Sequence, residues 1–269
     1  MRGPACPICG SHRFDPRRTD LLRCRGCGTQ VPAHEHGPTD TAALYNREYF
    51  EGRVYRDYVR EKSQRIEWFR RRLSVVERHL PRQGRVLDVG CAAGFFLELM
   101  RARGYSVHGL DVSAHAVCLA RNLGLEVRRA DIRSARYPSS HFDLVTMWDV
   151  LEHVPDPLGY LREAHRILRP TGVLLVETLN IGSFTARLLG RRWPLFAPPY
   201  HLFYFTRPAM RMMLARTGFL TVRAVPVQSY VPLPGGITTW RYADRPLVRA
   251  LVGSLCADVL IYVAVRGSG

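Results

Sequence analysis

The stretch RVLDVGCAAGFFLEL, residues 85–99, decides the fold of this chain. Residues 86–89 form a short run of mostly apolar residues with one acid, which is typical of a buried parallel strand. Gly90 and Gly94 then bracket a tight turn, and residues 95–103 have helical spacing. Because glycines let the backbone approach a ligand closely, this strand, turn and helix predict a nucleotide-binding corner.

Acidic residues also follow the next two predicted strands. The apolar run 105–110 ends in Asp111, and the short strand 126–129 is followed by Asp131. The glycine spacing differs from G-x-G-x-x-G and offers no cradle for a pyrophosphate. Together with Asp88, these acids suit a cofactor that has an ammonium group, a ribose and an adenine amine but no phosphate. S-adenosylmethionine (SAM) fits that description, and the alternative is an ordinary doubly wound domain with acids at these positions by chance.

Composition limits the protein class. The 269 residues suit one α/β domain with a small accessory module, and 46% hydrophobic residues provide a sizeable core. The net charge of +16 invites a nucleic-acid partner, but Lys62 is the only lysine and the arginines are scattered. A dedicated nucleic-acid groove is therefore possible but not favoured. No signal peptide is visible, and the longest apolar stretch, 250–265, contains Asp258, so we expect a cytoplasmic protein without a membrane span.

Two CxxC pairs near the start of the chain predict a metal site. Their ligands would be Cys6, Cys9, Cys24 and Cys27, with fourteen residues between the pairs. Each pair is followed by a glycine, which frees backbone amides to point at the thiolates. Four thiolates fill a tetrahedral zinc site, so we predict a zinc ribbon. Disulfides are the alternative, and the lack of a secretion signal disfavours them.

Hydrophobic patterning divides the chain into three parts. We predict a zinc ribbon at 1–32, a linker and helical lid at 33–80, and an α/β domain at 81–269. Within the last part, strands and helices alternate as in a parallel sheet with crossovers. The remaining predicted elements are strands at 142–148, 173–178, 220–227 and 259–265, helices at 157–168 and 208–217, a turn at 169–172 and a loop at 228–250.

At this point the chain resembles the class I SAM-dependent methyltransferases, and within them the ubiquinone-biosynthesis-like subgroup. The resemblance implies a Rossmann-like, seven-stranded methyltransferase sheet, to which this chain adds the zinc ribbon and the helical lid. It rests on VLDVGCAAGFFLEL (86–99), GLDVS (109–113), ADI (130–132), FDLVTMWDVLEHVPDP (142–157), LRPTGVLLVETLN (168–180) and PPYHLFYFTRPAMRMMLARTGF (198–219). One departure is Ala92, where the commonest motif has its middle glycine. Alanine allows the tight turn as long as its φ stays negative.

The resemblance also implies cofactor-binding roles at ten positions. The backbone of the glycine turn would hold the methionine part, the acids would bind the ammonium, ribose and adenine amine, and the apolar residues beside them would contact the adenine. The last two positions, at the end of the strand 142–148, would lie near the reacting methyl. These residues are Asp88, Gly90, Cys91, Gly94, Asp111, Val112, Asp131, Ile132, Trp148 and Asp149.

Two histidines are the candidates for acid–base chemistry at the acceptor. His153 follows the strand 142–148, and His201 lies in the irregular segment 180–204 that should wall the acceptor pocket. An imidazole with a pKa near neutral can remove a proton from an acceptor hydroxyl. For His153 a structural hydrogen bond is the alternative role.

Three functions remain open at this stage. The first is methylation of a small-molecule acceptor, a sugar or other secondary metabolite of natural product biosynthesis, with O-methylation favoured. The second is an rRNA or tRNA methyltransferase that uses the zinc ribbon and the basic surface. The third is a non-catalytic zinc-ribbon adaptor, which the intact Asp88, Asp111 and Asp131 disfavour.

Overall fold

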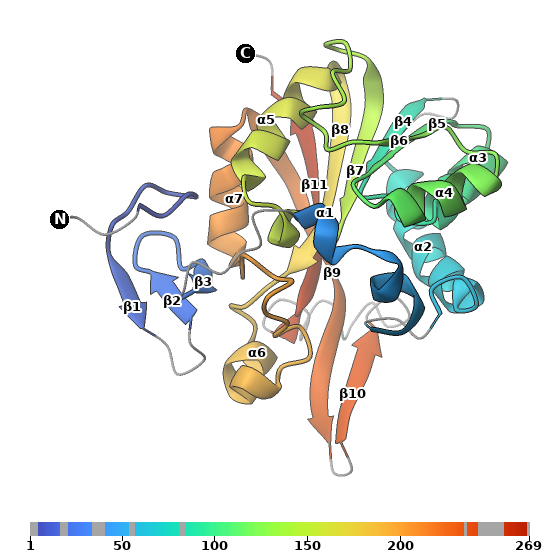
Figure 1. Cartoon of the computed structure of the whole chain (residues 1–269). Helices are drawn as coiled ribbons and strands as arrows, with labels where there is room; N and C mark the ends of the chain where they lie inside the picture. The colour runs from blue at the N-terminus through green and yellow to red at the C-terminus, as the bar shows by residue number, and fades with distance from the viewer. Residues whose placement is uncertain are drawn as a thin grey trace. The chain divides into compact units, whose positions relative to one another are not determined.

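The computed structural model describes residues 5–16, 21–33, 41–53, 57–80, 84–233, 236–241 and 256–267, which fall into two compact units (Figure 1). We name the units after a feature of each. The ribbon unit comprises Met1–Gly37, Asp149–Leu161 and Val176–Ala264, and the glycine-turn unit comprises Pro38–Trp148, Arg162–Leu175 and Val265–Gly269.

The glycine-turn unit contains the strand, turn and helix predicted from residues 85–99. Its strands β4, β5, β6 and β7 are parallel, and β4 pairs with both β5 and β7. Helix α3 begins directly after the turn, with Gly94 as its N-cap in the left-handed conformation. The elements are α1 (Thr41–Leu44), η1 (Tyr49–Arg53), α2 (Lys62–Val76), β4 (Arg85–Val89), α3 (Phe95–Ala102), β5 (Ser106–Asp111), α4 (Ala114–Asn122), β6 (Val127–Arg129) and β7 (Phe142–Trp148).

The ribbon unit begins with a small antiparallel sheet, β1 (Phe14–Pro16), β2 (Leu21–Cys24) and β3 (Gln30–Pro32). Polar caps start its later helices: Ser183 caps α6 and Thr206 caps α7 through bonds to backbone N–H groups. The later elements are η2 (Leu151–His153), α6 (Phe184–Leu189), η3 (Gly190–Arg192), α7 (Arg207–Arg216), β9 (Phe219–Leu233), β10 (Gly236–Arg241) and β11 (Val259–Arg266).

Two elements run through both units, helix α5 (Pro157–Ile167) and strand β8 (Leu168–Leu179). The strand order is β8-β7-β4-β5-β6 in the glycine-turn unit and β10-β9-β11-β8 in the ribbon unit. This is the Rossmann-like sheet expected from the sequence, and the small N-terminal sheet is present as well. No helix among the described residues is both long and apolar enough to cross a membrane.

Two local predictions were wrong. Residues 169–172 were expected to form a turn, but strand β8 continues through them. Arg169, Pro170 and Thr171 are exposed, so the missing N–H of the proline leaves no buried group unsatisfied. Residues 228–241 were expected to be a loop, but β9 and β10 pair there as an antiparallel hairpin rich in β-branched and aromatic residues. The rest of that expected loop, 242–250, and most of the linker, 34–40, lie outside the described residues.

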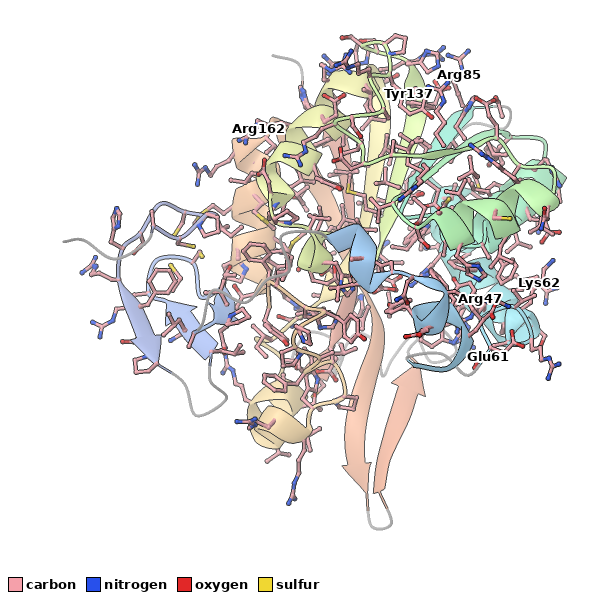
Figure 2. All side chains as sticks on the ribbon, in the orientation of Figure 1. Arg47, Glu61, Lys62, Arg85, Tyr137 and Arg162 are labelled. Atoms are coloured by element: carbon pink, nitrogen blue, oxygen red, sulfur yellow. The ribbon has the colours of Figure 1, made fainter. Side chains whose placement is uncertain are left out.

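Arginines brace the end of the sheet at which β4 begins. Asp143 accepts hydrogen bonds from the backbone N–H of Arg85 at 2.7 Å and from Nη1 of Arg169 at 2.6 Å. The Tyr137 carbonyl accepts another from Arg166. Arg85 and Tyr137, labelled in Figure 2, mark this end of the unit. Part of the large positive charge therefore serves to hold the glycine-turn unit together.

Candidate cofactor turn, histidine cluster and cysteine site

The turn after β4 is held by its own backbone. The N–H groups of Gly90 and Cys91 both donate to the Leu110 carbonyl, at 2.7 and 3.0 Å, and that of Gly94 donates to the Cys91 carbonyl at 2.9 Å. Gly90 and Gly94 have φ of 71° and 77°, which favours glycine. Because these N–H groups already bond to Leu110 of β5 or within the turn, a ligand beside the turn can use carbonyl oxygens instead.

Ala92 does not keep the negative φ that the sequence analysis expected. Its φ is 48°, in the left-handed region, which costs a non-glycine residue roughly 1–2 kcal/mol. Its N–H donates to Oδ2 of Asp111 at 2.9 Å. This conformation aims the amide at the carboxylate, so the strained residue joins the turn to the end of β5.

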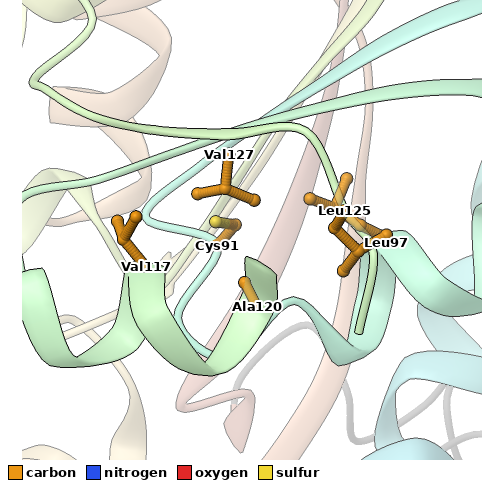
Figure 3. Close-up of a cluster of buried hydrophobic side chains, with 6 residues drawn as sticks. All are labelled: Cys91, Leu97, Val117, Ala120, Leu125 and Val127. Atoms are coloured by element: carbon orange, nitrogen blue, oxygen red, sulfur yellow. The ribbon is translucent and has the colours of Figure 1, made fainter. Parts of the chain in front are cut away.

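A packed cluster fixes the position of helix α3 behind the turn (Figure 3). A Cβ at Gly94 would lie 2.4 Å from Cδ1 of Leu125 and 3.1 Å from Cβ of Ala120, so only glycine fits there. Cys91 is buried in the same cluster, which contains Cys91, Leu97, Val117, Ala120, Leu125 and Val127. The sulfur of Cys91 therefore packs against apolar side chains, in keeping with a role for this residue through its backbone.

Asp111 is a buried carboxylate held by backbone donors. Besides the bond from Ala92, its Oδ1 accepts from the N–H of Ser113 at 2.8 Å. Burial raises its pKa, and these backbone hydrogen bonds oppose the rise. A carboxylate has about four lone-pair sites, so both oxygens retain capacity for ribose hydroxyls.

Asp88 lies on β4 and is 2% exposed. Its Oδ1 accepts from Oγ1 of Thr146 at 2.6 Å. Burial raises its pKa to about 7, although that hydrogen bond and the positive charge of Arg72 oppose the rise. The group can therefore ionise readily near neutral pH when a further positive charge approaches it. Sequence reasoning missed Arg72, whose only signal was its place in a run of three arginines.

The aromatic end of β7 carries an unsatisfied donor. Trp148 is 7% exposed, its ring meets Phe96 edge to face, and the Arg72 guanidinium lies 5.0 Å from the ring centroid. Its Nε1 is buried and makes no hydrogen bond within the part of the chain that the structure describes. A buried N–H without an acceptor is costly, so this atom is suited to donate to a bound molecule.

The other expected cofactor residues are more open. Asp131 is half-buried, and its Oδ1 accepts from the N–H groups of Arg133 and Ser134 at 2.7 and 2.9 Å. Ile132 beside it is fully buried, and Val112 is half-buried. Asp149, in the ribbon unit, is exposed and has a left-handed φ of 55°. Asp88 thus lies one residue before the end of β4, Asp111 ends β5 and Asp131 follows β6 by two residues, so the three carboxylates lie near the ends of successive strands, as the sequence predicted.

The ribbon unit brings Glu152, His153 and His201 together. One side-chain oxygen or nitrogen of each lies within 4.8 Å of the others, and the two imidazole centroids are 4.7 Å apart. Nδ1 of His153 lies 2.9 Å from the Tyr200 carbonyl, and Nδ1 of His201 lies 2.8 Å from the Leu195 carbonyl. Because a carbonyl only accepts, both Nδ1 atoms must be protonated, which leaves each Nε2 as an acceptor.

Burial keeps this cluster uncharged. It lowers the pKa of His201 to about 3, with a smaller effect from His153, and it also lowers the pKa of His153. Burial, and then the charge of Asp149, raises the pKa of Glu152 to about 8. The Glu152 carboxyl group accepts from Thr178 at 3.0 Å. The two neutral imidazoles can accept a proton, and together with the carboxyl group, once it is ionised, they can hold a divalent cation.

Glu152 also organises the backbone around His201. Its carbonyl accepts from the N–H groups of Leu202 and Phe203 at 2.8 and 3.1 Å. Sequence reasoning named the two histidines but missed Glu152 and Thr178, although the adjacent Glu-His pair was a usable signal. Trp193, in the same irregular segment as His201, is 1% exposed and donates to Asp258 at 2.9 Å, so it belongs to the core.

The four expected metal ligands lie together in the ribbon. The Sγ atoms of Cys6 and Cys27 are 3.7 Å apart, and those of Cys9 and Cys24 are 3.4 Å apart. In a tetrahedral zinc site with Zn–S of about 2.3 Å, neighbouring sulfurs lie about 3.8 Å apart. The hydrogen bond between Cys6 and Cys27 lowers the pKa of Cys27 and raises that of Cys6, as expected for two neighbouring sulfurs that share one proton when no metal is bound. The donor set therefore fits zinc.

The sequence of this chain is similar to those of known methyltransferases. Residues 58–224 match the model of a methyltransferase domain family. A ubiquinone biosynthesis O-methyltransferase of Xanthomonas campestris is 32% identical over 188 residues, which cover 65% of this chain and 75% of that protein. A relative with the same name from Thiobacillus denitrificans is 32% identical over 176 residues, covering 60% and 75%.

Solved structures with the same fold have less similar sequences. A SAM-dependent methyltransferase from Archaeoglobus fulgidus has a TM-score of 0.59 at 18% identity, with 78% of this chain and 99% of that chain covered. One from Methanosarcina mazei has a TM-score of 0.55 at 16% identity, with 72% and 98% covered. At these identities the likeness shows the fold alone, and it confirms the fold expected from the sequence.

Proposed function

We infer that this chain, which belongs to the methyltransferase domain family, methylates a hydroxyl group of a small-molecule acceptor, a sugar or another secondary metabolite. As a member of that family it is a SAM-dependent methyltransferase. The O-methyltransferase relatives support oxygen as the methylated atom. The observation that carries the proposal is the buried, uncharged cluster of Glu152, His153 and His201.

SAM supplies a methyl group on a positively charged sulfur. The acidic residues of the glycine-turn unit suit this cation: Asp88 would favour the ammonium group and Asp111 would accept from the ribose hydroxyls. Asp131 with Ile132 would take the adenine, beside Val112, and the carbonyl oxygens of Gly90, Cys91 and Gly94 would face the methionine part. The buried Nε1 of Trp148 donates to a bound molecule, and Asp149 follows it in the chain.

The histidines deal with the proton of the acceptor. An unprotonated imidazole nitrogen accepts a hydrogen bond from the acceptor hydroxyl and orients its oxygen lone pair. As the new C–O bond forms, the hydroxyl proton becomes strongly acidic, so a base as weak as His201 can take it. A bound SAM would release its methyl group with the C–S electron pair left on sulfur, and the imidazole would pass the proton to solvent.

Four thiolates would hold one zinc ion at Cys6, Cys9, Cys24 and Cys27. Such a closed site leaves no open coordination position for chemistry, so its role is structural. A reducing compartment such as the cytoplasm would keep these thiols available for the metal.

The test compares turnover with cofactor binding. Purified wild-type protein, His201→Gln and His153→Gln are incubated with SAM and a panel of phenols and sugars, and the demethylated cofactor is quantified. We expect kcat to fall by ~10²–10⁴-fold in His201→Gln while the SAM Kd stays within about twofold. The exposed His12, replaced by glutamine, is the control.

Three outcomes would count against this assignment. If His201→Gln turned over within a few-fold of wild type, His201 would not act as a base. Bringing the acceptor close to the methyl donor would then account for the rate. Activity that requires an added divalent ion and vanishes with a chelator would make the histidines ligands rather than bases. Methylation of RNA in preference to the panel would replace the small-molecule acceptor.

A further inference from the structure

The segment that carries His201 is bound to the cysteine ribbon a few residues later. The N–H of Gln30, on β3, donates to the Tyr204 carbonyl at 3.0 Å, and the N–H of Tyr204 donates to the Gln30 carbonyl at 2.9 Å. Oγ1 of Thr206 donates to the carbonyl of Cys27 at 2.9 Å. The second contact therefore ends on the backbone of an expected zinc ligand.

Tyr204 connects this contact to the histidine cluster. Its side chain is fully buried, and its ring lies edge to face with His201 at 5.7 Å between centroids. Between these two residues, the backbone N–H groups of Leu202 and Phe203 donate to the Glu152 carbonyl. The short segment 201–206 is thus held at one end by Glu152 and at the other end by the ribbon.

The ribbon also packs closely against the elements around this segment. A Cβ at Gly28 would lie 3.3 Å from Cγ2 of Thr206, so the knuckle and the cap of helix α7 approach closely. Arg216, near the end of α7, donates to the Ile8 carbonyl of the first knuckle. Leu21 of β2 joins the buried cluster that contains Leu179, Ala186, Trp193 and Tyr204.

Apart from its contacts with Tyr204, Thr206 and α7, the ribbon has little besides its cysteines to keep it folded. Its strands are three or four residues long, and small sheets of this size are marginal in water without a cross-link. Metal binding by four thiolates supplies folding free energy to such modules. The positions of Gln30 and of the Cys27 carbonyl therefore depend on metal bound by the four cysteines.

We propose that the zinc-loaded ribbon is a positioning element for the histidine cluster, acting on His201 through Tyr204 and Thr206. The catalytic relevance of this coupling rests on the proposed function, but the coupling itself is a property of the fold. Loss of zinc should move or loosen His201 and His153 while the glycine turn keeps its shape. The metal would then control acceptor chemistry without touching the acceptor.

The first experiment follows imidazole signals rather than activity. Histidine-labelled protein is studied by NMR before and after a chelator removes zinc, with metal analysis of both samples and assignments from His153→Gln and His201→Gln. We expect the signals of His153 and His201 to shift or broaden, those of His108 and His141 in the glycine-turn unit to stay, and the SAM Kd to remain within about twofold.

Any of three results would overturn the proposal. The purified protein could contain no metal, or the signals of His153 and His201 could stay unchanged when zinc is removed. In the third case the signals of all four histidines change together when zinc is removed. The last would mean that zinc holds the whole fold rather than this site. None of these measurements requires turnover. The proposed coupling can therefore be disproved while the proposed methyl transfer is supported, and the methyl transfer can be disproved while the coupling is supported.

A second pair of variants tests the contact with zinc retained. Thr206→Val removes the hydroxyl that donates to Cys27 and that caps α7 but keeps the side-chain shape, whereas Thr206→Ser keeps both bonds. We expect the His201 signal to shift in Thr206→Val and to match wild type in Thr206→Ser, at equal zinc content. An unshifted signal in Thr206→Val would show that the ribbon does not act through Thr206.

Discussion

The glycine-turn unit and the ribbon unit differ in what opposes the effect of burial on their ionisable groups. Burial raises the pKa of Asp88 to about 7 and also that of Asp111, but the charge of Arg72 and two backbone N–H groups, respectively, favour their charged forms. Glu152 and His201 have pKa values displaced to about 8 and about 3, so both are neutral at pH 7. The difference suits the two tasks proposed above, in which one unit attracts a cation and the other meets a neutral hydroxyl.

The largest effect on cofactor binding is expected at the acid that should hold the ribose. Asp111→Asn keeps the size of the side chain but removes its charge, and charge-assisted hydrogen bonds contribute ~1.5–3 kcal/mol each. We expect the SAM Kd, measured by calorimetry, to rise at least tenfold. Asp143→Asn is the matched control, because Asp143 braces the opposite end of the same sheet. Equal affinity in Asp111→Asn and wild type would remove this residue from the cofactor site.

The neutral cluster should leave a signature in the pH dependence of stability. A folded-state pKa below the ordinary 6.5 means that keeping His201 neutral costs stability increasingly as pH falls below 6.5. A raised pKa means that keeping Glu152 protonated costs stability increasingly as pH rises from about 4.5 to about 8. The two slopes oppose each other between about pH 4.5 and 6.5, each amounting to at most about 1.4 kcal/mol per pH unit.

Single variants should separate these slopes. Relative to wild type, His201→Gln should gain stability as pH falls below 6.5, and Glu152→Gln should gain it as pH rises above 4.5. Urea unfolding of the three proteins from pH 4.5 to 8 measures both trends, and effects common to all three cancel. Parallel curves would mean that these groups titrate normally and that the contrast between the units is wrong.

The smallest effect concerns the strained turn. Ala92→Gly relieves the left-handed conformation, worth roughly 1–2 kcal/mol, but loses roughly 0.5–1 kcal/mol to backbone entropy. We expect a net stabilisation of about 0.5–1 kcal/mol in urea unfolding at pH 7. Ala93→Gly, at a buried neighbour without positive φ, should instead destabilise the protein. A loss of stability in Ala92→Gly would show that packing of the Ala92 methyl group stabilises the protein by more than the backbone strain destabilises it.

The sequence predicted those features whose residues lie close together along the chain. The turn at 90–94 and the acids 88, 111 and 131 follow strands directly, so contiguous patterns predicted them. The cysteine pairs were predictable for the same reason, since metal-ligand spacing is short. The bonds of Glu152 with Thr178, Leu202 and Phe203 join segments up to about 50 residues apart, and no local pattern specifies them. The hairpin of β9 and β10 was predicted as a loop because prolines and glycines interrupt its sequence pattern.

One buried carboxylate gives the chain an order of assembly. Asp258, directly before β11, accepts hydrogen bonds from Ser183, Thr185 and Trp193, which precede it by 75, 73 and 65 residues. A ribosome makes the donors first, so they have no access to this acceptor until Asp258 has been synthesised. The core around Trp193 is therefore completed only after β11 has emerged, although its donors were made much earlier in translation.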